Sequence, residues 1–399
     1  MEEKNNLSEI MTGNESQQML SSQNKVTSFL KNINWGAYGV IIATIIIWMF
    51  FSFTTDGLFL SPRNLTMMLI QGVVLGIVVN GVLLIMVTGN IDISVASVVG
   101  LSATIAAWLQ AVMGWETLPT LIVVIAVGMI IGLLQGTWVA YLGIPAFIVT
   151  LAGQTIFRGA AFLLSHGQTY SPMTTSFKLI AGGSTSTLVS AIIIVLAALL
   201  VIFLQIRAID KNESFSKNLL KILKNSVPSL IMIAVVAYIS LSYNGIPYPV
   251  LILAVLCLVV NFIANRTRFG RHLYAIGGNP EAAVMSGINV KLHVLLVFTG
   301  MGVLYGLSGI VLASRINGAP PDPALFLEMD AITACVIGGT SMFGGVGTIP
   351  GAILGTVLLI SLNNGMDLMG ISTFVQFVVK GIVLLLAVLL DISMKRKRA

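Results

Sequence analysis

Long apolar runs separated by short polar stretches make up the chain from residue 36 to residue 391. A helix that spans a bilayer needs about 20 apolar residues, each rising 1.5 Å. By this measure, the pattern predicts apolar segments at residues 36–53, 66–88, 94–113, 119–141, 144–165, 188–206, 228–242, 247–263, 293–314, 331–343, 346–363 and 373–391. The short segment 331–343 suits a half-helix packed inside the protein. We therefore expect an all-α polytopic membrane protein with about ten to twelve transmembrane or half-membrane helices.

Polar ends flank this apolar region. Residues 1–34 are rich in Ser, Asn, Gln and Glu, and they predict a cytoplasmic tail rather than a signal peptide. Residues 35–394 form the predicted transmembrane domain, and residues 395–399 form a basic cytoplasmic tail.

The basic residues predict how the chain is oriented. They gather in the N-terminal tail, in the long loops 207–226 and 264–292, and at the C-terminus. If the segments alternate in direction, all four regions lie on one side, which is the cytoplasmic side because Lys and Arg concentrate there. Counting 331–343 and 346–363 as separate segments is required for this result. We expect both termini and both loops to be cytoplasmic.

Composition excludes several classes of protein. Only 9% of the residues are charged and the mean hydropathy is +0.97, so lipid is the expected surroundings of most of the surface. A net charge of +6 spread over short loops and tails does not predict nucleic-acid binding. Cys257 and Cys335 lie in apolar segments and predict neither a disulfide framework nor a metal site.

Catalytic and nucleotide-binding motifs are missing from the sequence. It contains no G-x-x-x-x-G-K-[ST] phosphate loop, no H-E-x-x-H and no G-x-S-x-G. We expect no enzymatic activity and no cofactor in this chain. If it moves a solute uphill, a partner supplies the energy.

The loop 264–292 contains a pattern with a clear physical interpretation, E-A-A-x-x-x-G from Glu281 to Gly287. Asn279 suits the N-cap of a short helix, Pro280 suits its first position, and Gly287 suits its end. Such a helix on the cytoplasmic face fits a groove on another protein. A plain connecting helix is the competing interpretation.

This pattern resembles the coupling loop of ABC importer permeases, which docks on the ATPase subunit. Two further stretches are similar to signatures of the ribose/xylose-type sugar permeases: Gly89 to Ser97, which reads G-N-I-D-I-S-V-A-S, and Val336 to Thr348, which reads V-I-G-G-T-S-M-F-G-G-V-G-T. The likeness extends from about residue 36 to the end and is closest to the xylose (multiple-monosaccharide) branch. Asn90 and Ala96 depart from the usual signature, so the signature does not identify which sugar is the substrate.

The resemblance implies several roles. Glu281, Ala282, Ala283 and Gly287 would couple the chain to an ABC ATPase that holds Mg-ATP. Asp92, Ser94, Gly338, Gly339 and Gly345 would frame the translocation pathway. Further implied partners are an extracytoplasmic sugar-binding protein, a second copy of the permease in a homodimer, and membrane lipid. The implied location is the bacterial inner membrane.

Polar side chains in or beside apolar segments are the other pathway candidates. The neutral ones suit the hydroxyls of a sugar: Asn90, Gln154, Thr340, Asn363, Asn364 and Gln376. Hydrogen bonding between helices is the alternative for each of them. Asp92 is favoured as a cap for the helix that starts near Ser94. Lys380 lies deep in its segment and is favoured as an interior, paired cation, whereas Arg158 can snorkel to an interface.

Together these features predict a permease subunit of an ATP-driven importer for a monosaccharide, with a pentose such as D-xylose foremost. Galactose, arabinose and ribose are alternative substrates. A secondary transporter driven by an ion gradient is the rival class, although it leaves the loop around Glu281 without a role.

Overall fold

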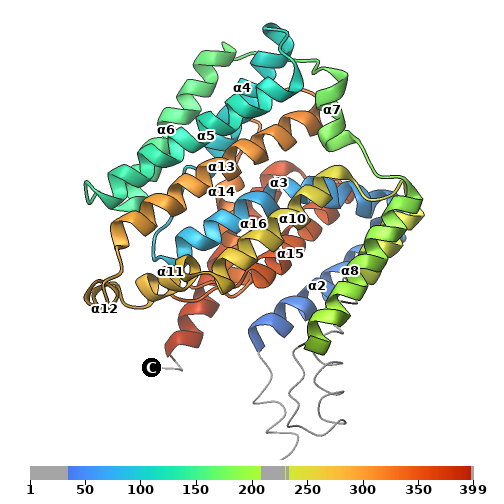
Figure 1. The fold of residues 1–399 in the computed structure, drawn as a ribbon. Coiled ribbons are helices and arrows are strands. Elements are labelled where there is room, and N and C mark those ends of the chain that lie inside the picture. Colours follow the sequence, from blue (N-terminus) through green and yellow to red (C-terminus); the bar gives the residue numbers. More distant parts are fainter. Residues whose placement is uncertain (1–34, 208–229, 231–232, 397–399) are drawn as a thin grey trace, which may run out of the picture.

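The computed structural model describes residues 35–207, 230 and 233–396, which form a tilted bundle of helices without a sheet (Figure 1). The elements are α2 (Trp35–Thr54), η1 (Leu58–Leu60), α3 (Pro62–Val87), α4 (Val95–Ala107) with its π-helical extension η2 (Trp108–Val112), α5 (Thr117–Ala140), α6 (Ala146–Ser165), α7 (Thr175–Gly182), α8 (Thr187–Arg207), an apolar helix at Ile233–Ser242, α10 (Tyr248–Arg266), α11 (Arg268–Gly278), α12 (Pro280–Met285), α13 (Val290–Ile316), α14 (Leu327–Ile337), α15 (Ile349–Leu368) and α16 (Thr373–Arg396).

The centre of the bundle is built from α3, α4 and α13, whose apolar side chains are buried almost all round. Helix α13 packs against α3, α4 and α5. Glycines let two of these backbones touch, because a Cβ on Gly128 of α5 would overlap the Gly302 carbonyl of α13, and a Cβ on Gly302 would overlap the Gly128 carbonyl. Small residues at helix contacts are typical of membrane proteins, where close packing replaces the hydrophobic effect.

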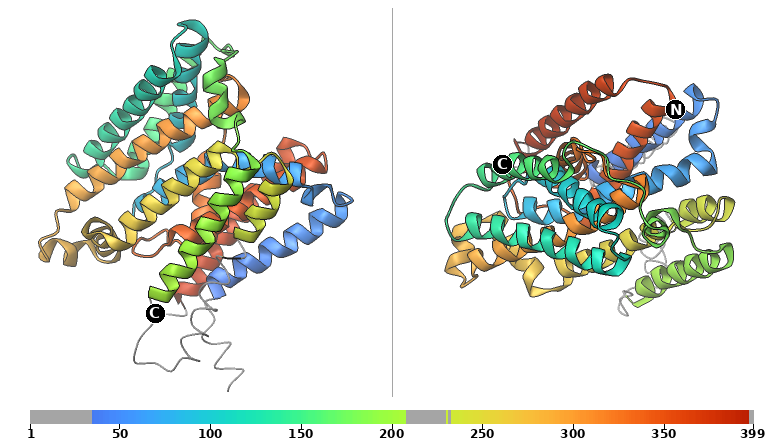
Figure 2. Two further views of the ribbon diagram at one scale, coloured as in Figure 1. Left: turned by 45° about the vertical axis from the view of Figure 1, so that its right-hand side comes forward. Right: turned by 90° about the horizontal axis from the view of Figure 1, so that it is seen from above.

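The outer helices expose apolar side chains. Phe53 of α2 and Phe374 of α16 are 86% and 81% exposed, and α8 lies at the edge of the bundle (Figure 2). Seven described helices, among them α5, α6 and α10, are long and apolar enough to cross a membrane. Shorter apolar helices lie in α2, α8, residues 233–242 and α16. This confirms the prediction of an all-α polytopic membrane protein.

The bundle has two ends. The first residues of α2, the last residues of α8, the helix α12 and the last residues of α16 lie at one end, which we call the α12 end (Figure 1). Helix α7 lies at the opposite end. The described residues that adjoin the four basic regions of the sequence thus lie at a single end of the bundle. The side of the membrane on which this end lies stays a prediction.

Most predicted segments correspond to helices, with one clear change of boundary. The segment predicted at 331–343 is a helix of 11 residues, α14, which starts at Leu327 and ends at Ile337. Gly339 follows with φ +87°, so residues 338–348 run as an irregular loop instead of helix. Helices α7 and α11 were not predicted. The predictions for residues 1–34, 208–226 and 397–399 concern segments outside the described residues.

Candidate functional site

The half-helix α14 gathers most of the charged side chains inside the bundle. Its 11 residues span about 16 Å, roughly half of a hydrocarbon core. Glu328 and Asp330 lie in its first turn and are 3% and 9% exposed. Buried carboxylates at membrane depth are costly unless they are paired, and they mark pathways in transporters. Their partners come from three other helices.

The first partner is Lys380 on α16. Its Nζ lies 2.8 Å from Oδ2 of Asp330, and Asn363 of α15 interacts with the same carboxylate. The predicted interior, paired position of Lys380 is therefore confirmed. A cation, an anion and an amide from three helices meet at this point.

The second set of partners comes from α6. Gln154 Nε2 donates to Oε1 of Glu328 at 3.0 Å. One turn further on, Nε of Arg158 lies 3.4 Å from Oδ2 of Asp322, in the segment that leads into α14. Arg158 thus has a carboxylate partner and does not simply snorkel to an interface.

Two other pathway candidates tie helices together. Asn364 of α15 and Asn64 of α3 exchange hydrogen bonds of 2.8 and 3.0 Å through their side-chain amides. Gln376 of α16 donates to Oδ1 of Asp367 at 2.8 Å and to the carbonyl of Ile371 at 3.0 Å. These contacts correspond to the alternative of hydrogen bonding between helices.

The first signature forms a buried hydrogen-bond network at the start of α4. Oδ1 of Asp92 accepts from both the backbone N–H and the hydroxyl of Ser94, at 2.9 and 2.7 Å. Ser94, not Asp92, is the N-cap of α4, so the prediction that Asp92 caps this helix is wrong: its carboxylate binds the cap residue and no N–H of the helix. Tyr305 of α13 donates to Oδ2 of Asp92, and Gln135 of α5 donates to Oγ of Ser94 at 2.9 Å. Asn90 instead bonds locally, from Nδ2 to Oγ1 of Thr88 at 2.9 Å.

The second signature lies against the first and against α11. Gly345 donates its N–H to the carbonyl of Val87 at 2.9 Å, and Tyr274 of α11 donates its hydroxyl to the carbonyl of Gly347 at 2.8 Å. Burial raises the pKa of Tyr274, which keeps the hydroxyl protonated as a donor. Gly338 touches the backbone of α15, and Thr340 is fully buried. The two signatures therefore form one loop contact at the α12 end.

Helix α12 has the predicted caps. Oδ1 of Asn279 accepts from the N–H of Ala282 at 3.0 Å, Pro280 is the first helical residue, and Gly287 takes φ +78° after the last turn. Ala282 and Glu281 are exposed, whereas Ala283 is 97% buried within the chain.

The burial of Ala283 changes the expected contact surface. Its side chain faces the rest of this chain, where α12 packs on α11 and α13. The side chains that α12 presents outward include Val284 and Met285, which are 60% and 90% exposed. The sequence pattern alone did not point to these two residues.

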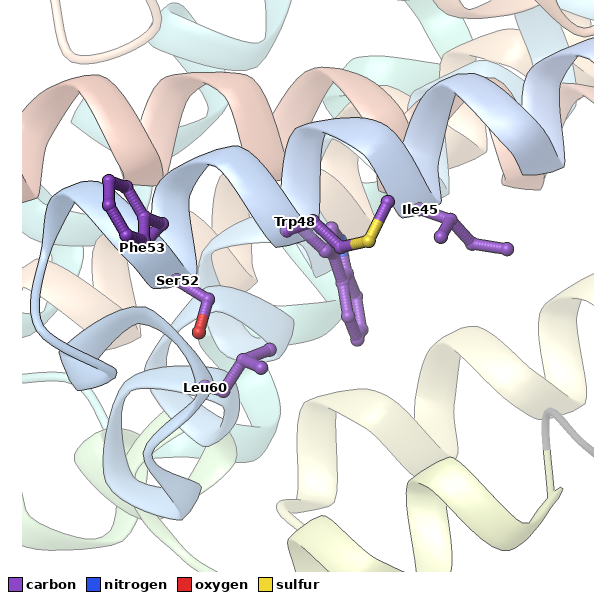
Figure 3. A pocket seen from close by; sticks show the side chains of 6 residues that line it. Ile45, Trp48, Ser52, Phe53 and Leu60 are labelled. Carbon is purple, nitrogen blue, oxygen red and sulfur yellow. The ribbon is translucent and has the colours of Figure 1, made fainter.

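A hollow of about 480 Å³ on the outside of α2 is chemically different from the polar cluster. It is lined by Ile45, Trp48, Met49, Ser52, Phe53 and Leu60 (Figure 3). Ser52 supplies the one hydroxyl of this lining, so the hollow suits an acyl chain or an apolar helix better than a sugar.

Sequence reasoning missed Glu328, Asp322 and Asp330 as members of the polar cluster. Because the helix was expected to begin at residue 331, these acids were assigned to a loop. The available signal was three carboxylates just before a short apolar segment, at the point where a half-helix enters the bundle.

Comparison with known proteins agrees with this architecture. A family model described as branched-chain amino acid transport system / permease component matches residues 64–388. The xylose transport system permease protein XylH of Haemophilus influenzae is 39% identical over 374 residues, 92% of this chain and 99% of that protein. The galactose/methyl galactoside import permease MglC of Escherichia coli is 30% identical over 95% of this chain and 99% of its own length.

A third relative, the ribose import permease RbsC of Bacillus subtilis, is 30% identical over 84% of this chain and 86% of its own length. No solved structure matches the chain. The family match runs from the start of α3 into α16, and the three relatives are matched over 86% to 99% of their own length. The chain is a multi-pass protein of the bacterial inner membrane and belongs to the family of branched-chain amino acid transport system permease components.

Proposed function

We propose that this chain is the permease subunit of an ATP-driven ABC importer and forms the translocation pathway for a monosaccharide, foremost the pentose D-xylose. The observation that carries the proposal is the 39% identity to a xylose permease over almost the full length of both chains. Identity to the galactose and ribose permeases is lower, at 30%. These sugars, with arabinose, are the alternative substrates.

The proposed transporter contains partners that perform the steps this chain lacks. An ABC ATPase subunit binds and hydrolyses Mg-ATP, since the chain contains no phosphate loop and is not itself an enzyme. An extracytoplasmic binding protein delivers the sugar, and a second copy of the permease completes the pathway. Membrane lipid covers exposed apolar side chains such as Phe53 and Phe374.

The proposed contact with the ATPase is α12. Its caps hold a rigid, exposed helix at the end of the bundle where α11 joins the two signature loops. A push on α12 is thereby transmitted to backbone that borders α3, α4 and α15. We expect Glu281 and Ala282 to lie in or beside the interface, with Ala283 and Gly287 maintaining the shape of the helix.

Uptake by whole cells tests the substrate. Deletion of the gene should abolish high-affinity uptake of labelled D-xylose, and expression from a plasmid should restore it. Uptake of arabinose, ribose and galactose at the same low concentration defines the range. Unchanged uptake of all four sugars after deletion would contradict the proposal.

An uncoupler separates the proposal from the rival class. Uptake should persist when the proton gradient is collapsed and ATP is maintained. Loss of uptake under these conditions would instead indicate a secondary transporter driven by an ion gradient.

A further inference from the structure

A buried acceptor atom and buried donor atoms near the first turn of α14 make no hydrogen bond to the described part of the chain. Oε1 of Glu328 accepts from Gln154, but Oε2 makes no hydrogen bond to any residue in the described ranges. Arg158 follows Gln154 by four residues on α6, so both lie on one face of that helix. Its Nε and Nη2 are buried and also lack hydrogen bonds to the described part of the chain.

The geometry of α6 brings these groups to one region. Gln154 bonds Glu328 at 3.0 Å, and Arg158 lies one turn away on the same face of α6. The ion pair that Arg158 makes with Asp322 has an N–O distance of 3.4 Å, longer than a good charge-assisted hydrogen bond. Within the described part of the chain, Arg158 thus has N–H groups without an acceptor, and Oε2 of Glu328 has no donor.

Leaving such groups unpaired is costly. A buried, unsatisfied polar group costs about 1–3 kcal/mol, and more when it is charged. Native proteins satisfy nearly all buried polar groups, so an exception calls for an explanation. A transient ligand supplies one, because it completes the hydrogen bonds only while it is bound.

A hydroxyl supplies the hydrogen-bonding groups that both side chains lack. It donates one hydrogen bond and accepts others, so it can donate to Oε2 of Glu328 and accept from Nη2 of Arg158. Gln154 lies beside both and holds the carboxylate in place. Adjacent hydroxyls, as on a sugar ring, would engage the carboxylate and the guanidinium together.

We propose that Glu328 and Arg158, with Gln154 positioning the carboxylate, form a hydroxyl-binding site for a neutral polyol in transit through the permease. The site rests on the proposed function and deepens it, since its ligand is the transported monosaccharide. Asp322 holds Arg158 while the site is empty. The pair of Lys380 with Asp330 is complete and lies outside the site.

Uptake into vesicles tests the site. The permease is reconstituted with its ATPase and a saturating amount of binding protein, and uptake of labelled D-xylose is measured per permease. Glu328→Gln keeps the size of the side chain but replaces the charged acceptor. We expect uptake to fall about tenfold, the effect of losing one hydrogen bond to a charged group. Glu116→Gln, at an exposed carboxylate before α5, should leave uptake unchanged.

Sugars that lack a single hydroxyl distinguish recognition from a structural role. The ratio of wild-type to variant uptake is measured for D-xylose and for each monodeoxyxylose that the wild type transports; the shared binding protein cancels in this ratio. We expect a ratio of about ten for D-xylose and near one for the analogue that lacks the recognised hydroxyl. Arg158→Lys gives the same comparison if Glu328→Gln does not accumulate.

Two results would overturn the site: unchanged D-xylose uptake in both variants, or the same loss for every analogue. Failure of the wild-type transporter to carry any monosaccharide would instead refute the proposed function, so the two ideas fail separately.

Discussion

At the scale of single residues, contacts between backbones decide where side chains are tolerated. Gly277 and Gly278 end α11 side by side, but their surroundings differ. A Cβ on Gly277 would overlap the carbonyl oxygen of Val87 and meet the N–H of Gly345 at 2.6 Å. A Cβ on Gly278 would meet no atom within 4 Å. The position of Gly277 is therefore the tight point between α11 and both signature loops.

This difference provides a matched pair of variants. Gly277→Ala should destabilise the protein by about 1–3 kcal/mol, because rigid backbone on both sides prevents relaxation. Gly278→Ala should be near neutral. Thermal unfolding in detergent and the abundance of the protein in membranes measure both. Equal stability of the two variants would contradict the contact between α11 and the loops.

The buried ion pair allows a second test at this scale. Lys380→Met leaves the carboxylate of Asp330 without its cation, and breaking a buried pair in this way costs about 3–5 kcal/mol. Adding Asp330→Asn to Lys380→Met removes the lone charge, so the double variant should recover much of the lost stability. The Tm values of both single variants and the double variant measure the coupling. Additive losses would show that the two side chains do not depend on each other.

At the scale of elements, local signals were predictable and pairings between distant elements were not. The caps of α12 follow from Asn279, Pro280 and Gly287, which act within a few residues. The bond from Tyr305 to Asp92 joins residues more than 200 positions apart, so no local pattern could specify it. Glu328 had a local signal, its place among three carboxylates before a short apolar segment, but its pairing with Gln154 of another helix had none.

The burial of individual side chains in α12 changes which of them we expect to contact the ATPase. Sequence reasoning treated both alanines as contact residues, but Ala283 is buried inside the chain and Met285 is 90% exposed. Met285→Asp should weaken co-purification with the ATPase and lower sugar-stimulated ATP hydrolysis at least tenfold, because exposed apolar side chains at a contact centre dominate binding.

The control for this prediction is the stability of the variant, measured as Tm. Met285→Asp should leave Tm in detergent unchanged, since the side chain touches little of its own chain. Ala283→Arg should lower both Tm and membrane abundance, because a large cation cannot fit a site that is 3% exposed. Normal ATPase coupling in Met285→Asp would show that this face of α12 is not the docking surface.

At the scale of the whole molecule, the apolar segments predicted the all-α architecture, because they can be recognised from the order of residues along the chain. Seven described helices are long and apolar enough to span a membrane, and the half-helix α14 stands out because its 11 residues are too few. The arrangement of the segments was not predictable. Contacts such as that of Gly128 with Gly302 depend on backbone approach between elements far apart in sequence.

The orientation of the whole bundle is testable with two positions at its opposite ends. Ser286 follows α12 and Thr175 begins α7; both are exposed. The charge pattern predicts that the α12 end is cytoplasmic, because helices adjoining the four basic regions of the sequence begin or end there (Figure 1). In a background without Cys257 and Cys335, an impermeant thiol reagent applied to intact cells should label Thr175→Cys and spare Ser286→Cys.

Permeabilised cells complete this experiment. Both cysteines should then react, which shows that protection of Ser286→Cys came from the membrane and not from the fold. Helices α8 and α13 run between the two ends of the bundle (Figure 1). Labelling at only one end would therefore show that all molecules have the same orientation in the membrane. Labelling of Ser286→Cys and protection of Thr175→Cys in intact cells would invert the orientation. An α12 outside the cell could not meet an ATPase, so that result would remove the proposed coupling contact as well.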